Sequence, residues 1–110
     1  MKVTLCGSTR FKSEFEATNR WLSKNGHIVY SVSCFSHSGD VVTDDEKVTL
    51  DLVHLKKIMD SECILVVGSV DGVPYLGEST RREIRWARML EKPVWFANHA
   101  NTLAAFKHID

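Results

Sequence analysis

The sequence predicts an α/β fold, namely a small Rossmann- or flavodoxin-like three-layer sandwich built on a four- to five-stranded parallel sheet. Two observations lead to this prediction. Short apolar segments alternate along the chain with segments whose apolar residues recur at helical spacing. One apolar segment, Cys63–Val67, is a continuous run, which is typical of a central parallel strand buried on both faces. Because the 110 residues contain no repeat or linker, we expect one domain over residues 1–110.

Strands are expected where apolar runs end at glycine or at a polar turn. The four expected strands are Lys2–Cys6, His27–Ser33, Cys63–Val67 and Val94–Phe96. Right-handed crossovers between parallel strands favour the order 2-1-3-4. Ligands bind such sheets beyond the carboxyl ends of the strands at which the order reverses, here between the first and third strands. The segments that leave these two ends are both rich in Gly, Ser and Thr.

Helices are expected between the strands. Thr43 and Glu46 have the spacing of a capping box, which predicts the start of the second helix. An apolar stripe on this helix is expected from the spacing of Val48, Leu52, Leu55 and Met59. The other expected helices are Arg10–Asn25, Thr80–Leu90 with its N-cap at Ser79 or Thr80, and a short terminal helix over Asn101–His108.

Composition excludes several classes of partner. Lys plus Arg equals Asp plus Glu, 14 each, so no net charge attracts a nucleic acid polymer or an anionic membrane. No apolar run reaches the ~18 residues that a membrane span needs. The first residues lead directly into a strand and do not form a signal peptide. We therefore expect a cytoplasmic protein whose partner is a small molecule.

The positions of the cysteines indicate free thiols and hence a reducing compartment. Cys6 and Cys63 lie inside apolar runs, where free thiols behave as small hydrophobic groups. Cys34 and His37 have the spacing of half a zinc site, but no second half follows. No metal and no cofactor are expected.

The first polar loop, Gly7-Ser8-Thr9-Arg10, has two interpretations. A strand that ends in these residues and enters a helix offers backbone N–H groups, hydroxyl groups and a guanidinium to an anion. The same residues also suit a plain helix cap, with glycine in the turn. The loop contains neither a Walker A motif nor a dinucleotide-binding G-x-G-x-x-G motif. Its position at the expected reversal of strand order favours ligand binding.

The second polar stretch, Leu76–Glu83, places a carboxylate on the helix face that is expected to be apolar. On a helical wheel Glu83 lies in the apolar stripe of the third helix, with Thr80 and Ile84, while the arginines lie opposite. A carboxylate there is costly unless it is hydrogen-bonded or paired. Three explanations remain open: a capping box between Thr80 and Glu83, a buried ionic partner, or a functional carboxylate in the cleft.

These two loops resemble those of the nucleoside 2-deoxyribosyltransferase-like superfamily, which includes nucleoside deoxyribosyltransferases and 2′-deoxynucleoside 5′-monophosphate N-hydrolases. The segment GESTRREIRWARMLEKPV is similar to the family's G-T-x-x-E-(I/L)-G-x-A…G-K-P-V signature, and Glu83 matches its nucleophilic glutamate. The family's aspartate on the second helix corresponds to His54. Asp51, one turn earlier, either substitutes for that aspartate or orients His54. Arg85 and Glu91 replace two glycines of the signature.

The resemblance implies cleavage or transfer at the N-glycosidic bond of a nucleoside or nucleoside 5′-monophosphate. Glu83 would attack C1′ and form a glycosyl-enzyme intermediate, as in retaining glycosidases. His54, whose unperturbed pKa is about 6.5, would donate a proton to the leaving base, although a purely structural hydrogen bond also accounts for it. The other expected site residues bind substrate: Gly7, Ser8, Thr9, Arg10, Asp71, Gly77, Ser79 and Thr80.

Within that set, Ser8, Arg10 and Ser79 would hold a 5′-phosphate. Asp71 would bind sugar hydroxyls, although Asp71-Gly72 is also a turn signal. The resemblance further implies a homodimer or higher homo-oligomer. Two other functions stay open. One is a non-catalytic nucleotide-binding sensor, and the other is a flavodoxin-like carrier of a phosphorylated cofactor.

Overall fold

The computed structural model describes residues 1–97 and Phe106. Its main sheet has four parallel strands in the order β2-β1-β3-β6, which confirms the predicted fold class. The strand labelled β6 is the fourth predicted strand, and its label is higher because two short strands precede it. The elements are β1 (Lys2–Cys6), α1 (Lys12–Lys24), β2 (Ile28–Tyr30), the 3-10 helix η1 (Ser36–Ser38), α2 (Asp44–Asp60), β3 (Cys63–Val66), β4 (Ser69–Val70), β5 (Val73–Pro74), α3 (Glu78–Met89) and β6 (Val94–Phe96).

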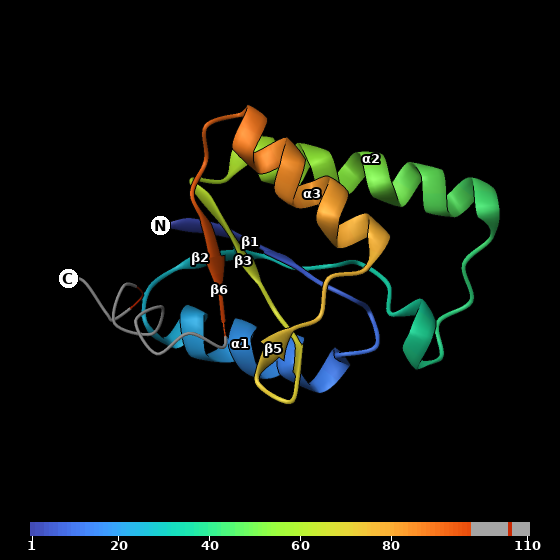
Figure 1. Ribbon diagram of the computed structural model, residues 1–110, viewed down its shortest axis with the longest axis horizontal. Helices are drawn as coiled ribbons and strands as arrows, with labels where there is room; N and C mark the ends of the chain where they lie inside the picture. The colour runs from blue at the N-terminus through green and yellow to red at the C-terminus, as the bar shows by residue number, and fades with distance from the viewer. Residues whose placement is uncertain (98–105, 107–110) are drawn as a thin grey trace.

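Helices cover both faces of this sheet, with α2 and α3 on one side and α1 on the other (Figure 1). Alternate residues of the central strands therefore pack into two cores. The core beneath α1 contains Val3, Leu5, Phe15, Leu22, Cys63, Leu65, Val67 and Phe106. The core beneath α2 and α3 contains Cys6, Ile58, Ile64, Val66, Ile84 and Ala87. Burial on both faces explains why β3 is apolar at every position.

The segment after β3 is more ordered than expected. The predicted loop contains an antiparallel hairpin in which β4 pairs with β5. Asp71 and Gly72 form its turn, and both have positive φ, 52° and 77°. This is the conformation that Asp-Gly turns favour. The terminal helix predicted over Asn101–His108 lies outside the described residues, apart from the buried Phe106.

Helix α2 begins where it is predicted to begin, but a different face of the helix is directed toward the sheet. The Thr43 side chain accepts from the Glu46 N–H at 3.2 Å and the Glu46 side chain accepts from the Thr43 N–H at 2.9 Å, so the capping box is present. The predicted apolar stripe is wrong as a core contact, because Val48, Leu52 and Met59 are exposed. The buried residues of α2 are instead His54 and Ile58. The inward face of α2 carries polar groups because it lines a pocket.

Gly7 is required by the close approach of two strand ends. Its φ is +146°, and a Cβ at this position would lie 2.3 Å from the carbonyl oxygen of Val67. The oxygen belongs to buried backbone and has little room to move. The position therefore excludes side chains both by conformation and by space.

We expect Gly7→Ala to lower the free energy of unfolding by at least about 2 kcal/mol, measured by urea denaturation. Gly39→Ala is the matched control, because Gly39 also has positive φ, +112°, but has nothing within 4 Å of the added Cβ. Gly39→Ala introduces conformational strain without a steric contact, and we expect it to lower the free energy of unfolding by about 1 kcal/mol. Equal losses in the two variants would show that the contact with Val67 does not matter.

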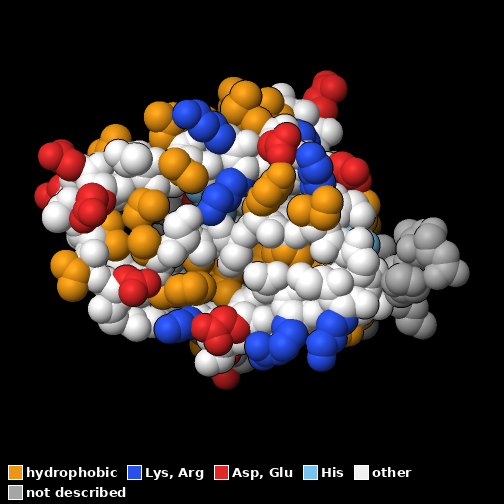
Figure 2. Space-filling view, turned by 180° about the vertical axis from the view of Figure 1, so that it is seen from behind, with side chains coloured by type: hydrophobic (Ala, Val, Ile, Leu, Met, Phe, Trp, Pro, Cys, Tyr) orange, Lys and Arg blue, Asp and Glu red, His pale blue; other side chains and the backbone are white. Residues whose placement is uncertain are grey.

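The described helices do not suggest a membrane span: over residues 1–97 none is both long enough and apolar enough to cross a bilayer. On the face shown in Figure 2, acidic and basic side chains are interspersed, and hydrophobic side chains are exposed among them over the helical layer. The surface therefore agrees with the balanced composition, 14 acidic and 14 basic residues.

Candidate active site

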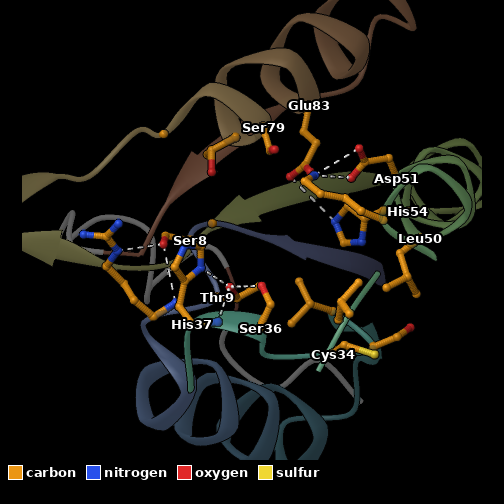
Figure 3. Close-up of a pocket in the computed structure, with 18 of the residues that line it drawn as sticks. Ser8, Thr9, Cys34, Ser36, His37, Leu50, Asp51, His54, Ser79 and Glu83 are labelled. Atoms are coloured by element: carbon orange, nitrogen blue, oxygen red, sulfur yellow. Dashed lines mark hydrogen bonds and ion pairs between the residues drawn. The ribbon is translucent and has the colours of Figure 1, made fainter. Parts of the chain in front are cut away.

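A pocket of about 400 Å³ opens beyond the carboxyl end of β1, between α2 and the first turn of α3. This volume is typical of sites for small organic ligands. Its lining includes most of the predicted site residues, namely Gly7, Ser8, Thr9, Arg10, Asp51, His54, Gly77, Ser79, Thr80 and Glu83. In Figure 3, Ser8 and Ser79 lie toward one end of the pocket and Glu83, His54 and Asp51 toward the other.

The loop after β1 is held in place by its own side chains. The Ser8 hydroxyl accepts a hydrogen bond from Arg10 Nε at 3.0 Å. The Arg10 guanidinium also stacks on the Tyr75 ring, 4.4 Å from its centroid. Thr9 Oγ1 hydrogen-bonds to His37 Nδ1, which ties this loop to η1. Because α1 begins only at Lys12, the loop is a separate turn and not the cap that the sequence also allowed.

The start of α3 differs from the prediction in a way that matters for binding. Its N-cap is Gly77, not Ser79 or Thr80. No side chain among the described residues caps this helix, so the capping box between Thr80 and Glu83 does not form. Uncapped N–H groups at a helix N-terminus attract anions. The first turn of α3 therefore presents such groups beside Ser79, at the pocket wall.

Glu83 points inward, as the helical wheel indicates. Only 8% of the residue is exposed, and Figure 3 shows its carboxylate directed from α3 toward His54 on α2. Burial raises the pKa of Glu83 to about 7, although the Cys6 thiol hydrogen bond and the Arg82 charge both act to lower it. Near neutral pH this carboxyl is partly ionised and is more basic than an exposed glutamate. Perturbed carboxyls in pockets are typical of functional sites.

His54 is buried next to Glu83, with 3.8 Å between His54 Nε2 and Glu83 Oε1. Burial and the charge of Lys57 lower the pKa of His54 to about 4. The ring is therefore neutral at pH 7, and its contact with Glu83 is not an ion pair there. The N–H of a neutral imidazole is a very weak acid, so the lowered pKa disfavours the general-acid role expected for His54. A positioning role fits the contact.

Cys6 completes the buried group, and the sequence interpretation treated it only as a small hydrophobic residue. Its Sγ lies 3.5 Å from His54 Nε2, and its thiol hydrogen-bonds to the Glu83 carboxylate. Burial raises the pKa of Cys6 well above that of a free thiol. Its position at the end of β1, directly before the loop Gly7–Arg10, is the signal that could have identified it.

Asp51 lies at the rim of the pocket and pairs with two cations. Lys47 Nζ is 3.1 Å from its Oδ1, and Arg82 Nη2 is 2.9 Å from its Oδ2. The Arg82 guanidinium also lies over the Trp86 ring, 5.2 Å from its centroid. The charge of Asp51 acts to raise the pKa of His54, but its carboxylate oxygens pair with Lys47 and Arg82 at the rim of the pocket.

One predicted residue stays outside the pocket and several unpredicted ones line it. Asp71 is exposed at the turn of the β4–β5 hairpin and does not line the pocket, so its turn-forming role accounts for it. Lys57 lines the pocket and donates hydrogen bonds to Ser31 O at 2.7 Å and Ser33 Oγ at 2.9 Å. Further lining comes from Val32, Cys34, Ser36, His37 and Leu50. The order 2-1-3 predicts that the segment after β2 borders the cleft, which is the signal for Val32, Cys34, Ser36 and His37. Leu50 and Lys57 lie on α2.

Two comparisons with known proteins, by family model and by curated sequence, were made. No protein-family model matches the chain, and a search of curated proteins finds no significant match. The function is therefore inferred from the geometry of the pocket and from the motif resemblance.

Proposed function

We propose that this protein cleaves or transfers at the N-glycosidic bond of a nucleoside or nucleoside 5′-monophosphate, with Glu83 as the nucleophile. The observation that carries the proposal is a buried carboxylate in the pocket beside an uncapped helix N-terminus and a Ser/Arg loop. A nucleotide offers matching chemistry, because it combines an anionic phosphate with a C1′ that a carboxylate can attack. The resemblance to the nucleoside 2-deoxyribosyltransferase-like superfamily leads to the same reaction.

The reaction proceeds in two displacements. A Glu83 oxygen forms a bond to C1′ as the C1′–N bond breaks, and the leaving base takes a proton from water in the open pocket. Water or a second base then attacks C1′, loses a proton to the hydroxide left by the first step, and releases the Glu83 carboxylate. The ionised carboxylate also stabilises the positive charge that develops on the sugar. Hydrolysis of a nucleotide by this route gives free base and a sugar phosphate.

The neighbouring side chains position the nucleophile. The Cys6 thiol and the neutral His54 ring contact the Glu83 carboxylate from two other elements, β1 and α2. Their contacts limit the orientations that the carboxylate can take, which lowers the entropic cost of attack. At the other end of the pocket, Ser8, Arg10 and Ser79 bind the 5′-phosphate in this proposal.

A direct test is to incubate the protein with a panel of ribo- and deoxyribonucleosides and their 5′-monophosphates, in the presence of a chelator. Released base is measured by reversed-phase chromatography. The proposal expects release of free base from at least one member of the panel. Nucleotide binding without base release would instead support a non-catalytic nucleotide-binding sensor module.

Arg10 allows a test of the phosphate end alone. We expect Arg10→Gln to raise KM for a 5′-monophosphate about tenfold or more, because a charge-assisted hydrogen bond is lost. KM for the matching nucleoside, which has no phosphate, is expected to stay the same. Arg85→Gln is the control, because Arg85 is exposed on α3 and does not line the pocket. An equal effect of Arg10→Gln on nucleoside and nucleotide would contradict a phosphate contact.

A further inference from the structure

Three side chains of the classes that bind transition metals meet at one buried point. Cys6 Sγ lies 3.5 Å from His54 Nε2, and His54 Nε2 lies 3.8 Å from Glu83 Oε1. The three ligand atoms are all within 4.8 Å of one another. Each residue is at most 8% exposed. The residues come from β1, α2 and α3, so the cluster is held by the packing of the fold.

The two separations that involve His54 Nε2 are close to those of a zinc site. Zinc binds sulfur at about 2.3 Å and nitrogen or oxygen at about 2.0–2.1 Å, usually as a tetrahedron. Tetrahedral geometry with those bond lengths places neighbouring ligand atoms roughly 3.3–3.6 Å apart. The S–N separation of 3.5 Å already falls in this range. The N–O separation of 3.8 Å needs a shift of only a few tenths of an ångström.

The donor set and its charge select the type of cation. A thiolate and an imidazole favour Zn²⁺ or Co²⁺ over Mg²⁺ and Ca²⁺, which prefer oxygen ligands. A dication bound by one thiolate, one carboxylate and a neutral imidazole gives a cluster with no net charge, which suits a buried position. The His54 ring also hydrogen-bonds to the Leu5 backbone, and such outer contacts hold a ligating imidazole in orientation.

We infer that Cys6, His54 and Glu83 bind one Zn²⁺ ion, with the remaining coordination position open to the pocket. The ion replaces the thiol proton, and also the carboxyl proton where that is present, so binding releases protons to solvent. His54 and Glu83 both line the pocket, which gives the ion a path of entry. Three protein ligands and one open position are also the composition of catalytic zinc sites.

Inhibition by zinc is a further expectation, and it rests on the proposed function. Bound Zn²⁺ occupies the carboxylate that would attack C1′, so zinc is expected to inhibit glycosyl transfer at this site. A chelator is then expected to restore base release, and Mg²⁺ at the same concentration is expected to have no effect. Zinc would thus act as a reversible block of the nucleophile.

The metal site is tested with Co²⁺, whose bond to a thiolate gives a characteristic near-ultraviolet absorption. The full-length protein is stripped with a chelator, exchanged into buffer and titrated with Co²⁺. We expect the absorption to saturate at one equivalent and to disappear when Zn²⁺ is added. Cys6→Ser is expected to abolish it. Cys34→Ser is the matched control, because Cys34 is a thiol that lines the same pocket but lies outside the cluster.

The readouts separate the two proposals. If no thiolate absorption appears in the wild-type protein, or if Cys34→Ser abolishes it while Cys6→Ser retains it, the zinc site is wrong. Circular dichroism shows whether Cys6→Ser is folded, and Glu83→Gln gives a second variant, which keeps the thiol and is expected to bind Co²⁺ more weakly. Absence of base release in chelator contradicts only the glycosidase proposal, since the Co²⁺ absorption does not depend on turnover.

Discussion

Glu83→Gln is expected to lower kcat for base release by at least about 10³-fold, which is a typical loss when a covalent nucleophile is removed. Glutamine has nearly the same shape as glutamate, but its amide oxygen does not form a stable bond to C1′. Substrate binding is expected to persist, because Ser8, Arg10 and Ser79 are unchanged. The measurement is base release by chromatography, with nucleotide binding followed by calorimetry in the same variant.

Glu62→Gln is the matched control for this loss. Glu62 is an exposed glutamate that directly precedes β3, at the end opposite the pocket, and it does not line the pocket. We expect its kcat to equal that of the wild-type protein. If Glu83→Gln retained wild-type kcat, the nucleophile would be another group and the proposed mechanism would be wrong.

Most of the fold could be predicted because it depends on local patterns that agree with one another. The apolar run at Cys63–Val67 predicts a strand buried on both faces, and the structure has β3 at Cys63–Val66. The Thr43 capping box predicts the start of α2 to the residue. The β4–β5 hairpin was missed because each strand has only two residues, too few to show a period of two.

The inward position of Glu83 was predictable, but that of His54 was not. On α3 the buried residues Thr80, Glu83, Ile84 and Ala87 share one face, so the wheel gives the correct side. On α2 the apolar spacing of Val48, Leu52 and Met59 indicates a face that the structure leaves exposed. Apolar periodicity identifies the core side only where the core side is apolar. Here the inward side of α2 lines the pocket and carries His54.

The pairing of Cys6 with Glu83 depends on tertiary structure alone. The two residues are far apart in the sequence, and their contact needs both the 2-1-3 strand order and the packing of α3 on β3, the strand next to β1. The shift in the pKa of Glu83 has the same origin, because burial is its main cause. Charges and hydrogen bonds that depend on such contacts cannot be read from spacing along one helix.

The raised pKa of Glu83 predicts a pH-dependent loss of stability in the metal-free protein. In the folded state the pKa is about 7, against the ordinary glutamate pKa of 4.5. Below both values the carboxyl is protonated in either state and contributes nothing. Between them the unfolded chain releases a proton that the folded chain keeps, so stability falls as pH rises from about 4.5 to about 7. The expected loss is about 3 kcal/mol.

His54 acts in the opposite direction over part of the same range. Its folded pKa of about 4 lies below the ordinary histidine pKa of 6.5. The stability that His54 contributes is therefore present above about pH 6.5 and is lost as pH falls toward 4. The two effects of pH on the free energy of unfolding therefore partly cancel in the wild-type protein. The effect of Glu83 must therefore be taken as the difference between wild type and Glu83→Gln, both of which contain His54. The charged or titratable groups that act on Glu83 are Cys6, Asp51, Lys47 and Arg82.

We expect Glu83→Gln to gain stability relative to wild type between pH 5 and pH 8, by up to about 3 kcal/mol, because glutamine has no charge to bury. Urea denaturation at both pH values, in chelator, measures this difference, and Glu62→Gln should show no comparable change. If the difference in free energy of unfolding between Glu83→Gln and wild type were the same at pH 5 and pH 8, the carboxyl would titrate normally in the folded protein. The carboxyl would then be well solvated, and the basic, desolvated nucleophile on which the glycosyl transfer depends would not exist.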